Sequence, residues 1–129
     1  MKIATPAKYG PDDVEVQRLR HIGGQLTVGH DPASAVSAAD VVHTDTWISM
    51  GQENEADVRR ADFAAYEVTE QLMSVANSGA KFMHCMPAHR DEEVSSEVFD
   101  GPRSLVIAQG HNRMHSARGA LAFLVKESS

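Results

Sequence analysis

Three short stretches of this sequence gather residue types that could do chemistry. They are HTDTWISMGQE at 43–53, HCMPAHR at 84–90 and GHNR at 110–113. Each stretch follows or ends an apolar run typical of a β-strand. Parallel strands bring their carboxyl ends to one edge of a sheet, and α/β proteins bind ligands there. We therefore expect the three stretches to converge on one site.

The first stretch offers a carboxylate beside hydrogen-bond donors. Asp45 ends a predicted strand and can hold a cation such as an ammonium group. Ser49 and Gly51 follow in a loop and can present hydroxyl and backbone N–H groups to an anion. This combination suits the paired α-ammonium and α-carboxylate of an amino acid. The alternative is that Asp45 caps a turn and Trp47 packs locally.

The second stretch contains the only cysteine and admits three interpretations. A metal site of His84, Cys85 and His89 is disfavoured, because adjacent strand residues point to opposite faces and zinc ligands are normally spaced more widely. A nucleophilic Cys85 would need a nearby base and a thiolate-favouring environment. The third interpretation is a thiol that only packs. Pro87 permits a cis Met86–Pro87 bond, which would turn the carbonyls of Cys85 and Met86 into an opening.

The third stretch places an arginine near the start of a predicted helix at 112–127, with Asn112 as its N-cap. Arg113 is thus expected in the first helical turn, where a cation opposes the helix dipole at a cost of about 0.3–1 kcal/mol. An anion or a developing oxyanion at the helix start would offset this cost. The alternative is a solvated arginine that swings away from the helix axis.

Strand-like and helix-like segments alternate along the chain and must position these stretches. Predicted strands cover 2–5, 25–31, 40–45, 81–85 and 104–110, and predicted helices cover 11–24, 32–40, 91–101 and 112–127. A longer helical pattern before Gly79 carries apolar residues near one face, namely Phe63, Tyr66, Leu72, Met73 and Ala76. This alternation predicts an α/β fold with a mostly parallel sheet.

Composition narrows the classes of function. The chain has 129 residues, which suits one domain, and its net charge of −6 comes without a basic run. These features argue against nucleic-acid binding, and no apolar stretch is long enough to cross a membrane. A single cysteine excludes an internal disulfide and favours a reducing, cytoplasmic location.

The motifs DTWISMGQE, FMHCMPAHR, EVFDGPRS and NRMH occur in this order. Together they resemble ornithine carbamoyltransferases, specifically their C-terminal, ornithine-binding domain, from about Lys2 to the C-terminus. SMG and HC-x-P-x-H-R favour this family over the aspartate enzyme, which shares the fold but lacks both motifs. The putrescine and acetylornithine enzymes remain alternatives. The resemblance implies a Rossmann-like three-layer α/β sandwich in which residues 1–129 form a partial ornithine-binding domain.

The resemblance also implies a reaction. A carbamoyl group would pass from carbamoyl phosphate to the δ-amine of ornithine, giving citrulline and phosphate, without a metal or an organic cofactor. Asp45 would bind the α-ammonium of ornithine. Ser49 and Met50 would lie on the loop that closes over the amino acid.

The expected catalytic residues are Cys85 and Arg113. By resemblance, Cys85 and Met86 would line the reacting centre, and their carbonyls would accept hydrogen bonds from the carbamoyl amide. The Cys85 thiol would help to deprotonate or position the δ-amine, without forming an acyl-cysteine. Arg113 would hold the carbamoyl oxygen and stabilise its tetrahedral oxyanion.

Several family features do not occur in this sequence. The Ser-Thr-Arg-Thr-Arg phosphate loop and the His-Pro-x-Gln stretch of the N-terminal domain are missing, as is the strand–helix unit that opens the ornithine domain. We therefore expect the isolated chain to show little or no turnover. A non-catalytic amino-acid-binding or interaction remnant is the alternative function. His111 also stands where the family usually has glutamate, and Met86 where leucine is commoner.

The missing strand is the central one of the family's sheet, so its two neighbours would expose unpaired backbone groups. This predicts either direct pairing of the strands at 2–5 and 40–45 or a partner that covers the gap. The partner would be a second copy in a homo-oligomer or a complementing N-terminal chain.

Overall fold

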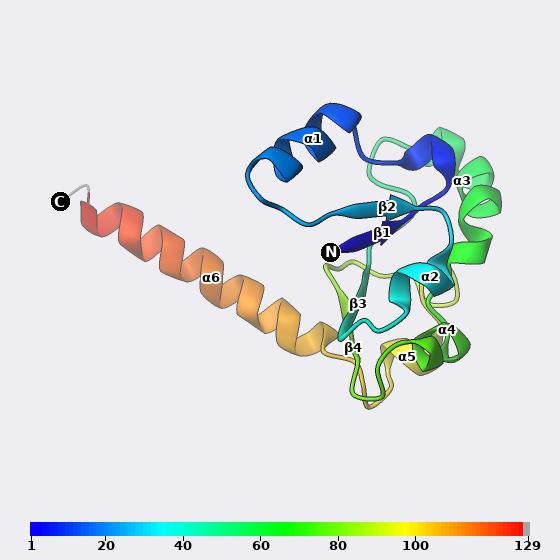
Figure 1. Ribbon diagram of the computed structural model, residues 1–129. Coiled ribbons are helices and arrows are strands. Elements are labelled where there is room, and N and C mark those ends of the chain that lie inside the picture. Colours follow the sequence, from blue (N-terminus) through cyan, green and yellow to red (C-terminus); the bar gives the residue numbers. More distant parts are fainter. Residues whose placement is uncertain (128–129) are drawn as a thin grey trace.

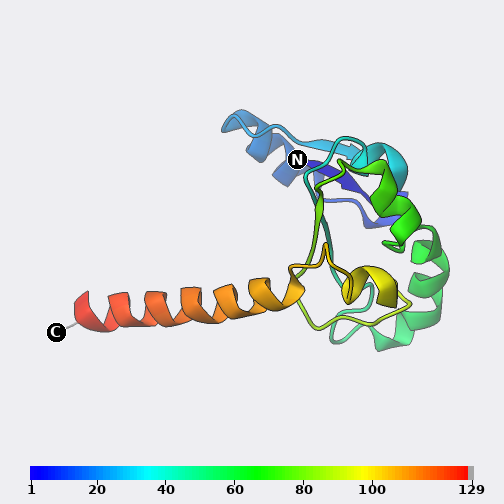
Figure 2. The ribbon, with the colours of Figure 1, turned by 90° about the horizontal axis from the view of Figure 1, so that it is seen from below.

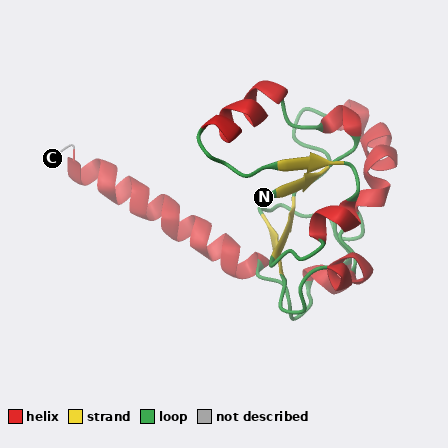
Figure 3. Cartoon of the chain, viewed as in Figure 1, coloured by secondary structure: helices red, strands yellow, loops and turns green. Residues whose placement is uncertain are grey.

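Four short strands form two parallel pairs in a computed structural model that describes residues 1–127. The strands are β1 (Lys2–Ala4), β2 (Thr27–Gly29), β3 (Val41–Thr44) and β4 (Lys81–His84). β1 pairs with β2, and β3 pairs with β4 in a register that sets Thr44 opposite His84. Figure 3 shows the strand pairs inside a layer of helices and loops. The prediction of an α/β fold with parallel strands is confirmed.

The predicted pairing between the segments at 2–5 and 40–45 is wrong. Over residues 1–127, β1 pairs only with β2, and β3 only with β4. Each strand has taken the parallel neighbour that follows it along the chain through a helical crossover, which is the commonest route to parallel pairing. The alternative, a partner that covers the gap, stays a prediction.

Helices surround the strand pairs, and four of those within residues 1–127 begin at a capping side chain. They are α1 (Asp13–His21), α2 (Pro32–Val36), α3 (Ala56–Phe63), α4 (Glu70–Val75), α5 (Ser96–Phe99) and α6 (Val106–Glu127), with 3₁₀ turns η1 (Ala7–Tyr9), η2 (Glu53–Glu55) and η3 (Ala64–Tyr66). The N-cap side chains of α1, α2, α4 and α5 accept hydrogen bonds from first-turn N–H groups; they are Asp12, Asp31, Thr69 and Ser95. Local sequence therefore decides where these helices start.

The long helical pattern before Gly79 is divided into α3, η3 and α4. The break lies at Val68, whose N–H donates to the carbonyl of Glu93 and whose carbonyl accepts from the N–H of Ser95. These long-range bonds draw the backbone of Val68 out of helical geometry. Thr69 then caps the new helix by accepting from the N–H of Leu72 at 3.2 Å.

The predicted strand at 104–110 and helix at 112–127 are both replaced by the single helix α6. The segment before α6 begins to pair with β4 in the manner of a strand. The N–H of Phe82 donates to the carbonyl of Arg103, and the carbonyl of Phe82 accepts from the N–H of Leu105. The pairing stops there, and the helix begins at Val106. A helix satisfies its own backbone groups, whereas a strand at this edge would leave one side unpaired. Asn112 consequently lies inside the helix and does not cap it.

The core lies between the β3–β4 pair and the helices around it. Its fully buried side chains include Phe82 of β4, Met73 of α4 and Val98 of α5. α6 extends away from this body, as both Figure 1 and Figure 2 show. Within residues 1–127, no helix is long and apolar enough to cross a membrane.

Candidate active site

Asp45 and Cys85 lie side by side at the carboxyl ends of β3 and β4. Each follows the last residue of its strand, and those last residues, Thr44 and His84, are direct partners in the parallel register. The thiol sulfur of Cys85 lies within 4.8 Å of a carboxylate oxygen of Asp45. The N–H of Thr46 donates to the same carboxylate at 2.8 Å. Two of the predicted convergent stretches therefore do meet.

The two groups hold each other in complementary protonation states. Burial raises the pKa of the Cys85 thiol to about 11, and the hydrogen bond and charge of Asp45 act in the same direction. Burial also disfavours the ionised form of Asp45, but hydrogen bonds from Cys85 and Thr46 outweigh it and hold the pKa of this carboxyl below its usual range. At neutral pH the pair is an ionised carboxylate and a neutral thiol. A thiolate nucleophile is therefore disfavoured.

Arg113 joins the same strand ends from α6. Its guanidinium donates a hydrogen bond to the carbonyl of Cys85. Since α6 begins at Val106, Arg113 lies in the second helical turn, and the prediction of a first-turn position was wrong. Gln109 anchors the start of α6, because its Oε1 accepts from the N–H of His84 at 2.9 Å. The third stretch thus reaches the site through a helix and not through a strand end.

The loop after Cys85 turns sharply at a cis Met86–Pro87 bond, as Pro87 allowed. Met86 has a φ of 60°, a left-handed conformation that is uncommon outside glycine. Its N–H donates to Nδ1 of His84 at 2.8 Å, which holds this conformation in place. The carbonyl of Cys85 faces the guanidinium of Arg113, and the Met86 side chain is 41% exposed.

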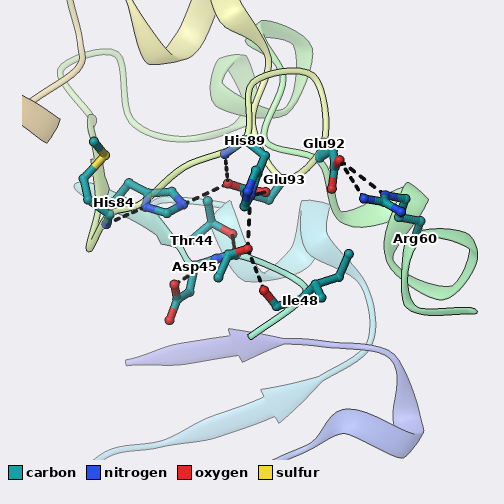
Figure 4. Close-up of polar contacts among 10 residues, drawn as sticks. Thr44, Asp45, Ile48, Arg60, His84, His89, Glu92 and Glu93 are labelled. Atoms are coloured by element: carbon teal, nitrogen blue, oxygen red, sulfur yellow. Dashed lines mark hydrogen bonds and ion pairs between the residues drawn. The ribbon is translucent and has the colours of Figure 1, made fainter. Parts of the chain in front are cut away.

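A buried His84–Glu93 pair supports this loop from below, and Figure 4 shows the contacts. Both side chains are 0% exposed, and His84 Nε2 lies 3.2 Å from Glu93 Oε1. Burial lowers the pKa of His84, although the charges of Glu93 and Asp45 oppose this effect, so the imidazole is neutral at pH 7. Because Nδ1 accepts from Met86, the proton lies on Nε2, which is 3.2 Å from Glu93 Oε1 but forms no well-aligned hydrogen bond with it.

Glu93 was not among the predicted site residues. The sequence pattern placed it in the acidic start of a helix at 91–101, whereas the structure begins α5 at Ser96 and buries Glu93. Its Oε1 also accepts from the N–H of His89 at 2.6 Å. The four-residue spacing between His89 and Glu93 was the one local signal that linked them.

A second polar contact ties the loop of the first stretch to that of the second. Thr46 Oγ1 lies 3.2 Å from His89 Nδ1 and donates to the carbonyl of Ile48 at 3.3 Å (Figure 4). Ser49 and Met50 follow on an exposed part of the loop, and Met50 is 98% exposed. Over residues 1–127, neither side chain is hydrogen-bonded to the strand-end groups. The structure therefore brings together Asp45, Cys85 and Arg113, and leaves Ser49 and Met50 apart from them.

Within residues 1–127, two groups of side chains are close enough to be considered for a metal. They are Asp45, His84 and Cys85, and His89, Glu92 and Glu93, with ligand atoms within 4.8 Å of one another in each group. The argument that His84 and Cys85 must point apart was wrong, because β4 ends at His84. However, the thiol is protonated, both nitrogens of His84 face protein partners, and Glu92 pairs with Arg60 at 3.3 Å. Neither group offers a set of free donors.

Comparison with known proteins shows which protein family this chain resembles. The family model described as "Aspartate/ornithine carbamoyltransferase, Asp/Orn binding domain" matches residues 1–124. The ornithine carbamoyltransferase of Clavibacter michiganensis subsp. michiganensis is 47% identical over 99% of this chain and 43% of its own length. That of Nitrosococcus oceani is 48% identical over 97% of this chain and 40% of its own length. The chain therefore spans about two-fifths of these relatives.

Solved structures share the fold over nearly the whole chain. The ornithine carbamoyltransferase of Pyrococcus furiosus aligns with a TM-score of 0.83 and 44% identity, over 94% of this chain and 40% of its own. The anabolic enzyme of Campylobacter jejuni aligns with a TM-score of 0.87 and 33% identity, over 98% of this chain and 43% of its own. An acetylornithine transcarbamylase complexed with acetylcitrulline aligns with a TM-score of 0.77 and 30% identity, over 95% and 39%. The fold is thus the Rossmann-like one of these enzymes.

Proposed function

This chain belongs to the aspartate/ornithine carbamoyltransferase family, and from that membership we propose that it supplies the ornithine side of a carbamoyl-transfer site. The substrates would be ornithine and carbamoyl phosphate, and the products citrulline and phosphate. The observation that carries the proposal is the convergence of an ionised Asp45, a neutral Cys85 thiol and the Arg113 guanidinium at one edge of the strands.

The roles follow from the charge of each group. Asp45 is ionised and exposed, so it can bind the α-ammonium of ornithine. Ser49 and Met50 lie on the exposed loop after Asp45, and movement of this loop would bring them over the bound amino acid. The Thr46–His89 contact marks where the loop is tied down. Loop closure of this kind excludes water and positions the reacting groups.

The transfer itself needs an amine without its extra proton. The neutral δ-nitrogen of ornithine attacks the carbamoyl carbon, a C–N bond forms, the C–O bond to phosphate breaks, and the proton that the nitrogen loses passes to the departing phosphate. The Cys85 thiol, with its pKa of about 11, positions the amine as a neutral partner and does not attack the carbamoyl group. The carbonyls of Cys85 and Met86 accept from the carbamoyl amide. Arg113 binds the carbamoyl oxygen and stabilises the oxyanion as charge develops.

A second candidate is a non-catalytic amino-acid-binding module. One observation favours it: the Arg113 guanidinium is bonded to the Cys85 carbonyl, so two groups needed for transfer are engaged with each other. In this case Asp45 and its loop would still bind ornithine. The two candidate functions differ in what happens when a partner completes the site: only the first predicts that citrulline then forms. The partner would be either a second copy or a chain carrying a carbamoyl-phosphate domain.

Calorimetry with ornithine tests the shared part of both candidates. We expect binding to the wild-type chain, loss of binding in Asp45→Ala, and unchanged binding in Asp57→Ala, whose carboxylate is fully exposed. Absence of any binding would contradict both candidates. Mixing the chain with a separately produced carbamoyl-phosphate domain of a relative then tests catalysis. Citrulline formed only by the mixture supports transfer, and ornithine binding without citrulline supports the non-catalytic module.

A further inference from the structure

The Gln109 side chain joins the start of α6 to both strands that carry the candidate site. Its Oε1 accepts a hydrogen bond from the backbone N–H of His84 in β4 at 2.9 Å. Its Nε2 lies 3.3 Å from Nε2 of His43, which belongs to β3. Among residues 106–126 of α6, Gln109 is the last that is not exposed to solvent. One side-chain amide therefore connects α6 to β3 and β4 together.

The contact with His84 fixes which way the amide of Gln109 points. A backbone N–H can only donate, so the atom that faces it must be the side-chain oxygen. The NH₂ group of Gln109 then faces His43, and this group can only donate as well. Nε2 of His43 must accept, which a neutral imidazole does only when its proton is on Nδ1. The contact therefore selects a neutral His43 in its Nδ1–H form.

Protonation of His43 breaks this arrangement. An imidazolium carries an N–H on both ring nitrogens, so Nε2 would face the NH₂ group of Gln109 as a second donor. Turning the amide over would repair that contact, but it would set the NH₂ group against the N–H of His84. Gln109 has a single side-chain oxygen and cannot serve both partners. The contact therefore responds to mild acid, the range in which histidine side chains ordinarily gain a proton.

Other charged and titratable groups lie on the elements packed around His43. They are Asp45 after β3, Lys81 and His84 of β4, and His111 and Arg113 of α6. Asp45 and His84 interact electrostatically with the His43 ring. His111 is two positions from Gln109 and so lies on the opposite side of the helix. These groups set how readily His43 gains a proton, but they leave the opposition between the protonated ring and the amide unchanged.

Arg113 follows Gln109 by one helical turn, and the two side chains bond to neighbouring residues at the end of β4. Gln109 accepts from the N–H of His84, and Arg113 donates to the carbonyl of Cys85. Residues four apart lie on the same helix face, so the two contacts hold one face of α6 against β4. In the proposed reaction Arg113 leaves this carbonyl and binds the carbamoyl oxygen. Gln109 is then the contact that keeps the helix in place.

We propose that Gln109 is a positioning residue for Arg113, and that neutral His43 is the acceptor that completes its hold on α6. The inference rests on the proposed function, because the oxyanion role of Arg113 is what requires the position. Protonation of His43 loosens the first turns of α6 and moves the guanidinium away from the strand ends. The site therefore loses activity in mild acid for a reason separate from the protonation of the substrate amine.

Nitrogen NMR of the histidine rings in the chain alone tests the contact without any need for activity. We expect neutral wild-type His43 to carry its proton on Nδ1. Gln109→Glu presents a carboxylate oxygen to the ring, so His43 should stay protonated to a higher pH. Gln71→Glu makes the same change on α4 and should leave His43 as in wild type. A wild-type His43 with its proton on Nε2, or a titration that Gln109→Glu does not move, overturns the proposal.

Relaxation of the backbone amides at 110–113 tests the hold on Arg113. Gln109→Leu removes both side-chain contacts and should increase the motion of these residues, with circular dichroism to show that the variant is folded. Lowering the pH from about 7.5 to about 5.5 should increase the same motion in wild type but not in His43→Gln, whose amide oxygen accepts without titrating. If Gln109→Leu does not fold, this second comparison decides alone. Motion in wild type that acid does not change overturns the proposal.

Turnover by the chain mixed with a carbamoyl-phosphate domain of a relative tests the positioning role. Between about pH 7.5 and 5.5, wild-type kcat should fall roughly two- to tenfold more than that of His43→Gln, the factor that one net hydrogen bond supplies. Ornithine binding at about pH 7.5, measured by calorimetry, should be equal in the two proteins. A constant ratio of the two kcat values overturns the proposal. If no citrulline forms at all, the proposed function fails, and the NMR experiments still decide whether Gln109 holds α6.

Discussion

The carboxylate of Asp45 and the thiol of Cys85 lie within 4.8 Å of each other at the point where β3 and β4 end. The parallel register fixes this contact, because the preceding residues, Thr44 and His84, are paired. The contact keeps the carboxyl ionised and the thiol protonated, and it is the most direct target for experiment in the candidate site.

Removing the charge of Asp45 should lower the pKa of Cys85. Burial is the largest cause of the raised value of about 11 and would persist, whereas the charge of Asp45 would be lost in Asp45→Asn, whose amide oxygen is a weaker acceptor than a carboxylate. The pH dependence of alkylation reports the pKa directly, since Cys85 is the only cysteine. Asp57→Asn, which changes a fully exposed carboxylate, is the control. An unchanged pKa in Asp45→Asn would mean that the carboxylate of Asp45 does not act on the thiol in solution.

Stability should fall at alkaline pH because of the same thiol. Between pH 9, the ordinary value for the thiol, and pH 11, the unfolded chain has released this proton while the native chain still holds it. The unfolded state then binds fewer protons, so the free energy of unfolding decreases by up to about 1.4 kcal/mol per pH unit. Urea denaturation should show a shallower decrease for Cys85→Ser. Identical slopes for the two proteins would contradict the raised pKa.

Glu93 should matter more for stability than its neighbour Glu92. Glu93→Ala leaves the N–H of His89 without its acceptor and removes the carboxylate that lies 3.2 Å from the buried Nε2 of His84, at a cost of about 1–3 kcal/mol in the free energy of unfolding. Glu92→Ala removes only a partly exposed pair with Arg60, a change of about 0–1 kcal/mol. Denaturant titration compares the two variants. Equal effects would show that the buried pair does not support the loop.

Arg113 should contribute to turnover in the reconstituted enzyme. If citrulline forms when the chain is mixed with a carbamoyl-phosphate domain, Arg113→Gln should lower kcat by about 10²–10³-fold, the usual cost of losing an oxyanion donor. Arg118→Gln alters an exposed arginine on the same helix and should leave kcat close to wild type. A kcat that survives Arg113→Gln would remove Arg113 from the proposed catalytic residues.

Gly101 should tolerate no side chain. A Cβ atom there would lie 2.4 Å from the carbonyl oxygen of Glu97, a backbone atom that cannot move cheaply. Gly101→Ala should therefore destabilise the protein by about 1–3 kcal/mol, as overpacking does. Gly79→Ala is the matched control, since no atom lies within 4 Å of its Cβ position. Thermal unfolding of both variants measures the difference, and equal melting temperatures would contradict the close contact.

Local sequence patterns determined much of the secondary structure of this protein. The alternation of apolar runs with helical segments predicted an α/β fold, and the ends of the runs before Asp45 and Cys85 indicated where a candidate site would lie. These features follow from side-chain periodicity and from caps such as Asp12, which act within a few residues and are therefore readable in order along the chain.

Tertiary structure decided the rest. The apolar run at 104–110 could form either a strand or a helix. It forms a helix because backbone pairing with β4 ends after Phe82 bonds to Arg103 and Leu105. Val68 forms backbone hydrogen bonds with residues about 25 positions away, and Glu93 is buried beside His84 and the backbone N–H of His89. Strand pairing and burial depend on contacts between distant segments. Local periodicity carries no record of them, so only the folded chain reveals which groups meet.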